Sequence, residues 1–335
     1  RLRDADVRDL GGDYLLPGFI DCQVNGGGDV LFNDAPTVET IRRIGAAHRA
    51  FGTTGFLPTL ISDDADVMRA AIAAVDAAIA EGVPGVLGIH LEGPYLAPAR
   101  KGVHDATKFR MPDARGIDLV SSLRNGRTVL TVAPERVPAE AIRELTQRGV
   151  IVCAGHTAAS YEETRAALDA GLRGFTHLFN AMSPLTSREP GVVGAALEDA
   201  SSWCGAIVDG FHVHPASLRV ALAAKRRGRM FLVTDAMPPV GGASDAFTLG
   251  GIRAVCRDGR CETPDGVLAG SALDMMSAVR NTVATLGVDV AEAARMASTY
   301  PADFLRLARH GRIAAGARAT LVVADRELRV RDVVG

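Results

Sequence analysis

Short apolar runs alternate with amphipathic segments along most of the chain, and this alternation limits the fold more than any other feature. The segments between the runs are rich in Ala, Leu, Glu and Arg, residues that favour helix interiors. Strands that alternate with helices form parallel sheets from βα units. Eight runs have the length of strands: Gly18–Val24, Thr54–Leu60, Gly85–Leu91, Thr128–Ala133, Val150–Gly155, Gly174–Phe179, Cys204–Val208 and Met230–Thr234. The helix-like segments include Val38–Phe51, Asp64–Ala80, Ala139–Arg148, Tyr161–Ala170 and Pro215–Arg227.

Eight βα units are the number that closes a TIM-type (β/α)8 barrel, and 335 residues suit a barrel of ~250 residues with additions. An open doubly wound sheet is the alternative. It usually has fewer units and a glycine-rich phosphate loop after its first strand, and neither GxGxxG nor GxxxxGK[ST] occurs here. The sequence therefore predicts an α/β protein with a barrel in residues 15–310.

Two stretches depart from the barrel rhythm. Residues 247–268 are typical of short strands joined by turns at Gly250-Gly251, Asp258-Gly259 and Asp265-Gly266, and a helix-like segment follows at Ser271–Leu286. Residues 311–335 are again strand-like. We expect residues 1–14, the insert 247–268 and the tail 311–335 to form one small β-sandwich-like subdomain beside the barrel. Ordinary loops and edge strands are the alternative.

Composition excludes several classes of partner. The net charge of -2 gives no general attraction to nucleic acid or to an anionic membrane, so an anionic ligand needs a local site. No apolar run approaches the ~18 residues of a membrane helix, and the charged start lacks a signal-peptide core. The five cysteines are odd in number and contain no CxxC pair, which favours reduced thiols in a cytoplasmic protein.

Polar residues stand at the downstream ends of the apolar runs. They are Gln23, Asn25, Glu92, His156, His177 and Asp235. Each alone is more often a structural residue, but in a parallel barrel these ends form the face that carries active sites. Convergence of two carboxylates and two imidazoles there predicts a metal-assisted hydrolase. His90 lies two residues before Glu92, and we expect it in the core or behind the site.

Glu92, His156 and His177 form a competent ligand set for one divalent ion and leave room for a water. Zn²⁺ suits these ligands best, and Fe²⁺, Co²⁺ or Mn²⁺ would also bind. Asp235 then remains as the general base. Metal identity stays open at this point.

The segment Pro17–Asp21 resembles the opening strand of the amidohydrolase superfamily. That superfamily usually continues with a His-x-His metal pair, where this chain has Gln23 and Asn25. Neutral amides are poor ligands beside carboxylates and imidazoles, so the departure favours one metal. A vestigial, weak second-metal position at Gln23 and Asn25 remains open.

An ordered series of motifs is similar to the N-acetylglucosamine-6-phosphate deacetylases of that superfamily. The motifs are His90–Tyr95, Ala154–Thr157, Thr176–Met182, Arg188–Gly191, Asp209–Val213 and Val233–Ala236. The resemblance implies a metal-dependent hydrolase barrel that removes the acetyl group from N-acetylglucosamine 6-phosphate in amino-sugar catabolism and cell-wall recycling. The family's leading β-segment is mostly absent, so we expect an N-terminal piece to be missing.

The resemblance also implies roles for individual residues. Asp235 matches the catalytic aspartate, as base and then as acid. Arg188 matches a phosphate-binding arginine, and His212 a histidine that contacts either the phosphate or the carbonyl oxygen. The remaining implied contacts come from Asn180, Ala181 and, on a loop after Glu92, His104. The family implies a homodimer in which some phosphate contacts cross the interface.

Two other functions compete with this one. The first is a related amidohydrolase that acts on the galactosamine epimer, a cyclic amide or a deaminase substrate. The second is a sugar-phosphate-binding regulator that has lost catalysis. Because Glu92, His156, His177 and Asp235 are all present, the sequence favours an active enzyme.

Overall fold

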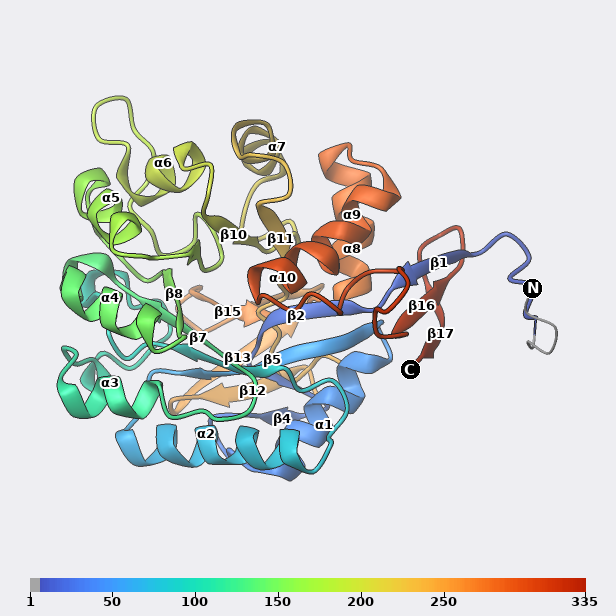
Figure 1. Cartoon of the computed structure of the whole chain (residues 1–335), viewed down its shortest axis with the longest axis horizontal. Coiled ribbons are helices and arrows are strands. Elements are labelled where there is room, and N and C mark those ends of the chain that lie inside the picture. Colours follow the sequence, from blue (N-terminus) through green and yellow to red (C-terminus); the bar gives the residue numbers. More distant parts are fainter. Residues whose placement is uncertain (1–6) are drawn as a thin grey trace.

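The computed structural model describes residues 7–335, and its central element is an eight-stranded parallel sheet. The strands follow the order β11-β10-β9-β8-β7-β6-β5-β2 and curl around a common axis (Figure 1). They are β2 (Phe19–Val24), β5 (Thr53–Ile61), β6 (Gly88–Glu92), β7 (Arg127–Val132), β8 (Ile151–Ala154), β9 (Gly174–Phe175), β10 (Trp203–Ala206) and β11 (Met230–Leu232). Each coincides with one of the eight runs expected to be strands, so the predicted (β/α)8 barrel is confirmed.

The two ends of this sheet, β2 and β11, meet through the residues just beyond β11. The amide of Asp235 donates to the carbonyl of Gln23 at 3.0 Å, and the amide of Asn25 donates to that of Ala236 at 2.9 Å. Buried Asp21 on β2 completes this seam by accepting the Thr234 hydroxyl at 2.5 Å. The seam therefore brings Asp235 next to the downstream end of β2.

Helices cover the outside of the barrel and bury their apolar faces against the sheet in one continuous core. They are α1 (Val38–Arg49), α2 (Ala65–Ala80), α3 (Ala114–Val120), α4 (Ala139–Gln147), α5 (Tyr161–Asp169), α6 (Gly191–Glu198), α7 (Pro215–Ala224), α8 (Met275–Leu286), α9 (Val290–Ala297) and α10 (Thr299–Phe304). Short 3-10 turns lie at Pro98–Arg100, Ala106–Lys108 and Pro134–Arg136. Among residues 7–335, no helix is long and apolar enough to cross a lipid bilayer.

Local capping explains where several helices begin. Ser160 and Glu163 form a reciprocal capping box at the start of α5. Asp274 caps α8, which therefore starts at Met275 and not at Ser271 as the sequence pattern indicated. The helices α3, α6, α9 and α10 were not among the predicted segments, because each has eight residues or fewer and is too short for a repeating pattern to stand out.

The chain termini form a three-stranded antiparallel sheet beside the barrel, at the right of Figure 1. Strand β1 (Tyr14–Pro17) pairs with β16 (Leu321–Ala324), which also pairs with β17 (Val330–Val334). This confirms the expected subdomain as far as the termini are concerned. Residues 1–6 of the expected N-terminal part lie outside the described residues.

The insert forms a separate four-stranded antiparallel sheet that packs on the barrel, so the expectation that it shares one subdomain with the termini was wrong. Its strands are β12 (Ala246–Leu249), β13 (Ile252–Arg257), β14 (Arg260–Glu262) and β15 (Leu268–Ser271). The reason is packing: Phe247 and Leu249 share a small hydrophobic cluster with Leu31, Ile61 and Met237 of the barrel. Leu31 belongs to a short hairpin of β3 (Gly26–Gly27) and β4 (Val30–Leu31) after β2.

The insert also overturns the expectation that all five cysteines are reduced. Cys256 on β13 and Cys261 on β14 are joined by a disulfide. The two residues face each other directly across the hairpin, a register that their spacing alone did not reveal. Cys22, Cys153 and Cys204 are free and buried in the barrel core, as the composition led us to expect.

Candidate active site

Three side chains from three strand ends meet in one buried cluster. Glu92 ends β6, whereas His156 and His177 each follow the last residue of their strand by two positions. Glu92 Oε1 lies 3.1 Å from His156 Nε2 and 2.9 Å from His177 Nε2. The two Nε2 atoms are 3.1 Å apart. Among the described residues, this group is arranged so that it could hold a metal ion.

The surroundings of the cluster fit a divalent cation. The Nδ1 of His156 donates to the carbonyl of Arg100 at 2.9 Å, which leaves its Nε2 free to act as a ligand. Burial alone would raise the pKa of Glu92, but its contacts with the imidazoles of His156 and His177 outweigh burial and hold that pKa well below the usual value. A buried carboxylate facing two imidazole nitrogens is a set of oxygen and nitrogen donors that Zn²⁺ and similar ions accept.

The backbone at the site is unusual. His156, His177 and Asp235 have φ angles of 48°, 34° and 54°, in the left-handed region that residues with a side chain seldom adopt. Such conformations cost on the order of 1–3 kcal/mol each and cluster at functional sites. All three side chains with this backbone conformation line the same pocket.

Asp235 is held by the two amides that replace the superfamily's histidine pair. Asn25 Nδ2 donates to Asp235 Oδ1 at 2.6 Å, and Gln23 Nε2 donates to the same oxygen at 3.1 Å. Gln23 Nε2 also lies 3.3 Å from Glu92 Oε2, so it bridges both carboxylates. Burial, reinforced by the negative charge of Glu92, raises the pKa of Asp235 to about 6.

A pocket of about 220 Å³ opens above these residues. Nine of the residues singled out in the sequence line it: Asn25, Glu92, His104, His156, His177, Asn180, Ala181, His212 and Asp235. Their convergence in one cavity is what a hydrolytic site requires, because ligands, base and substrate contacts must reach the same reacting group.

His104 closes one side of the pocket. Its loop brings the imidazole to 4.4 Å, centre to centre, from that of His156, and its Nδ1 lies 3.1 Å from Ser62 Oγ. Burial lowers the pKa of His104 to about 3, so the ring is neutral at physiological pH. His90 lies behind the cluster, where its Nε2 contacts Thr131 Oγ1 at 2.7 Å, in agreement with its expected position.

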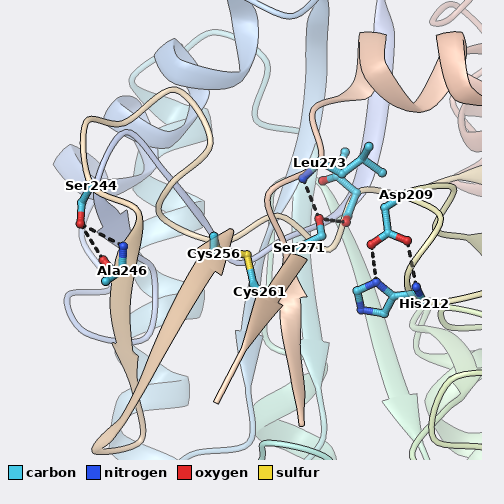
Figure 2. Close-up of a disulfide and its surroundings, with 9 residues drawn as sticks. Asp209, His212, Ser244, Ala246, Cys256, Cys261, Ser271 and Leu273 are labelled. Atoms are coloured by element: carbon cyan, nitrogen blue, oxygen red, sulfur yellow. Dashed lines mark hydrogen bonds and ion pairs between the residues drawn. A yellow bond between two sulfur atoms is a disulfide. The ribbon is translucent and has the colours of Figure 1, made fainter. Parts of the chain in front are cut away.

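His212 is hydrogen-bonded to an aspartate that sequence reasoning missed. The Nδ1 of His212 donates to Asp209 Oδ2 at 2.6 Å, as Figure 2 shows. The other carboxylate oxygen accepts the main-chain amides of Phe211 and His212, both at 2.9 Å. Burial would raise the pKa of Asp209, but the hydrogen bond and charge of His212 lower it. Asp209 lay in a recognised motif, and its position three residues before His212 was the available signal.

The apolar part of the pocket wall was also missed. It consists of Ile61, Val103, Met237, Val267, Leu268 and the backbone of Gly270. In the sequence these residues are indistinguishable from core residues, because the wall exists only where the insert folds over the barrel. Gly270 has a φ of 56°, and a Cβ there would lie 2.8 Å from the carbonyl of Asp235.

Arg188 is the one implied phosphate ligand that the single chain does not bring to the pocket. It is exposed on the loop between β9 and α6 and does not line the cavity. Asn180 and Ala181, at the beginning of the same loop, do line it.

Comparisons with known proteins agree with this geometry. Residues 14–334 match the amidohydrolase family. An N-acetylgalactosamine-6-phosphate deacetylase from Shewanella sp. (strain ANA-3) is 45% identical, over 94% of this chain and 80% of that protein. The structure of N-acetylglucosamine-6-phosphate deacetylase from Pasteurella multocida is 34% identical with a TM-score of 0.94, and the match covers 98% of this chain and 86% of that one.

A mutant N-acetyl-D-glucosamine-6-phosphate deacetylase from Mycobacterium smegmatis, solved in complex with N-acetyl-D-glucosamine-6-phosphate, is 36% identical. Its TM-score is 0.89, with 96% of this chain and 85% of that one covered. The family match extends over nearly the whole chain, and the identities hold over the same length. The chain therefore belongs to the amidohydrolase family of hydrolytic enzymes.

Proposed function

We propose that this enzyme hydrolyses the N-acetyl group of N-acetyl-D-glucosamine 6-phosphate, giving D-glucosamine 6-phosphate and acetate. The observation that carries the proposal is the meeting of Glu92, His156, His177 and Asp235 in one buried pocket. The relatives named above act on phosphorylated N-acetyl amino sugars, which fits an amide as the reacting group.

The proposed cofactor is one divalent ion per subunit, most suitably Zn²⁺, with Fe²⁺, Co²⁺ or Mn²⁺ as substitutes. Glu92, His156 and His177 would hold it. When bound, such an ion lowers the pKa of a water and polarises an amide carbonyl. Gln23 and Asn25 donate hydrogen bonds to carboxylates where a second ion would need ligands, which supports a single ion.

The proton transfers fall to Asp235. Its carboxylate accepts a proton from the attacking water and then delivers that proton to the departing nitrogen. The task needs a group that is ionised at neutral pH yet can hold a proton transiently, and a carboxylate whose pKa is raised by burial meets both needs. His104 is neutral and buried beside His156, and we assign it to the sugar or the acetyl oxygen.

The phosphate is assigned to Asn180, Ala181, Arg188 and His212. A guanidinium can hold a phosphate through two parallel hydrogen bonds. Because Arg188 is exposed and does not line its own pocket, we propose a homodimer in which it serves the partner's site. His212 takes either the phosphate or the carbonyl oxygen.

N-acetyl-D-galactosamine 6-phosphate is a second candidate substrate, since the relative with 45% identity bears that name. The two sugars differ only in the orientation of one hydroxyl. Steady-state rates on both epimers, with and without the 6-phosphate, distinguish them. Equal rates on phosphorylated and unphosphorylated sugars would contradict the phosphate assignment.

Acetate release from the phosphorylated sugar, with added Zn²⁺, tests the proposal itself. We expect turnover that depends on metal. Tight binding of the sugar phosphate without release of acetate would instead support the regulator. The proposed setting is the cytoplasm, without nucleic-acid or membrane partners.

A further inference from the structure

Cys256 and Cys261 occupy opposite positions of a tight hairpin. Arg257 pairs with Arg260 across the Asp258-Gly259 turn, and the next pair outward is Cys256 with Cys261. In a two-residue hairpin the pair flanking the turn exchanges hydrogen bonds, so the next pair is of the non-hydrogen-bonded kind, in which side chains approach most closely. The register therefore keeps the two sulfurs adjacent whether or not they are bonded.

The strand beside this hairpin is attached to the catalytic segment. β14 pairs with β15, with Glu262 opposite Leu268 and Arg260 opposite Ser271. The amide of Ser271 donates to the carbonyl of Asp235 at 2.9 Å, and Figure 2 shows Ser271 next to the disulfide-bearing hairpin. A displacement of β14 relative to β15 would therefore reach the backbone of Asp235.

Both cysteines also belong to the cluster that forms the apolar pocket wall. Cys256 is 9% exposed and Cys261 1%, and they pack in one group with Ile61 and Met237. Val103 packs against the same group. Ile61, Met237 and Val103 all line the pocket, so one side of the cluster forms the wall of the substrate site.

The tip of the hairpin abuts a further pocket segment. A Cβ placed on Gly259 would lie 3.5 Å from Phe211 Cε2. Phe211 directly precedes His212, which lines the pocket. The hairpin thus borders the site at three points: the wall cluster, the Asp235 segment and the segment that carries His212.

We propose that Cys256 and Cys261 form a reversible thiol-modification site whose redox state controls the tightness of the substrate pocket. Two molecules of a small thiol such as glutathione reduce the disulfide to two thiols and become one disulfide. Two electrons and two protons pass to the cysteines. The reverse reaction uses a small-molecule disulfide as oxidant. In the oxidised form the hairpin is fixed, and in the reduced form the insert is less constrained and the pocket binds substrate more weakly.

The remaining cysteines do not obscure this pair. Cys22, Cys153 and Cys204 are buried in the barrel core. Burial raises the pKa of Cys204 to about 11, and it also raises the pKa values of Cys22 and Cys153. Because Cys261 is itself only 1% exposed, thiols are labelled after unfolding, and peptide mass spectrometry assigns the label to individual cysteines.

The experiment compares the full-length protein after glutathione disulfide with the same protein after a phosphine reductant, both desalted and loaded with equal metal. We expect Cys256 and Cys261 to be unlabelled in the first sample and labelled in the second. Reduction should raise KM for the sugar phosphate about fivefold and leave kcat within about twofold. Amide exchange over residues 246–271 should be faster in the reduced sample.

Cys256→Ser/Cys261→Ser is the matched control. It should resemble the reduced protein and should not respond to oxidant. Identical KM and identical amide exchange in both redox states would overturn the proposal, as would an equal response of the double variant. Although KM depends on the proposed function, thiol counts and amide exchange do not. A protein without deacetylase activity would therefore still test the disulfide.

Discussion

The two carboxylates of the site, Glu92 and Asp235, are positioned by different means. Glu92 ends β6, whose neighbours β5 and β7 pair with it along its length, so the sheet itself sets its position. Asp235 lies beyond β11 at the seam, where side chains of Asn25 and Gln23 and the amide of Ser271 hold it. One half of the site is set by strand pairing and the other by a few separate hydrogen bonds.

This difference predicts two kinds of mutational response. Within the ligand cluster each side chain is indispensable, because three donors have to reach one point. At the seam several contacts share one task, so the loss of one should give a graded effect of about 1 kcal/mol. Variants in the two halves should therefore separate all-or-none effects from partial ones.

The largest effect is expected in the ligand cluster. His177→Ala removes one of three ligands, so metal content should fall from about one ion per chain toward zero and acetate release should fall more than about 10³-fold. Elemental analysis and an acetate assay measure both. His214→Asn is the matched control, because that side chain only caps α7. Full metal content in His177→Ala would contradict the statement that each side chain of the ligand cluster is indispensable.

Asp235→Asn should separate chemistry from binding. Because the amide cannot accept a proton, kcat should drop about 10³-fold, within the range of general acid–base catalysis. Metal content and affinity for the sugar phosphate should stay near those of the unmodified protein, measured by elemental analysis and calorimetry. Normal turnover would refute the role assigned to Asp235.

Arg188→Ala should act on binding alone. Loss of a charge-assisted contact of about 2 kcal/mol corresponds to a rise in KM of roughly 30-fold for the phosphorylated sugar. Rates on the unphosphorylated sugar should be unchanged, and Arg143→Ala, which alters an exposed side chain on α4, serves as the control. An equal loss of activity on both sugars would contradict the assignment of Arg188 to phosphate binding.

Asn25→Ala probes the seam. It removes the 2.6 Å hydrogen bond to Asp235 but leaves that of Gln23. We expect kcat to fall about tenfold with metal content intact, since one neutral donor to a charged acceptor is lost. A collapse as deep as that of His177→Ala would show that the seam is as indispensable as the ligand cluster.

Substitution of Asp21 is expected to have the smallest effect on turnover. Its main effect should be on the free energy of unfolding. Burial raises its pKa to about 7, so the folded state favours the protonated acid. In the unfolded chain the carboxyl of Asp21 ionises near pH 4. The unmodified protein therefore loses stability as the pH rises from about 4 to about 7. Asp21→Asn cannot ionise. Its free energy of unfolding relative to the unmodified protein should rise by about 2–3 kcal/mol between pH 5 and pH 8. Urea unfolding at both values measures this, and a pH-independent difference would contradict it.

The sequence predicted features that depend on local pattern. Apolar runs followed by a polar residue identified the eight strands, and with them Glu92, His156 and His177. Features set by packing between distant segments could not be predicted in this way. The insert's separate sheet depends on the contact of Phe247 with the barrel, and the disulfide depends on hairpin register.

The left-handed backbone at His156, His177 and Asp235 also left no local signal, because none of the three is glycine. Leu268 and Gly270 became pocket residues only once β15 lay against the Asp235 segment. The amides of Gln23 and Asn25 were recognised as a departure from the superfamily, but their function as donors to Asp235 depends on how β2 meets the residues after β11.

The central claim is that one ion on Glu92, His156 and His177 serves hydrolysis of an amino-sugar phosphate. The most direct measurement is elemental analysis of the metal-purified protein, paired with acetate release from N-acetylglucosamine 6-phosphate before and after chelation. The account predicts about one divalent ion per chain, and activity that disappears with chelation and returns with Zn²⁺. Acetate release that persists in protein shown to contain no metal would contradict it.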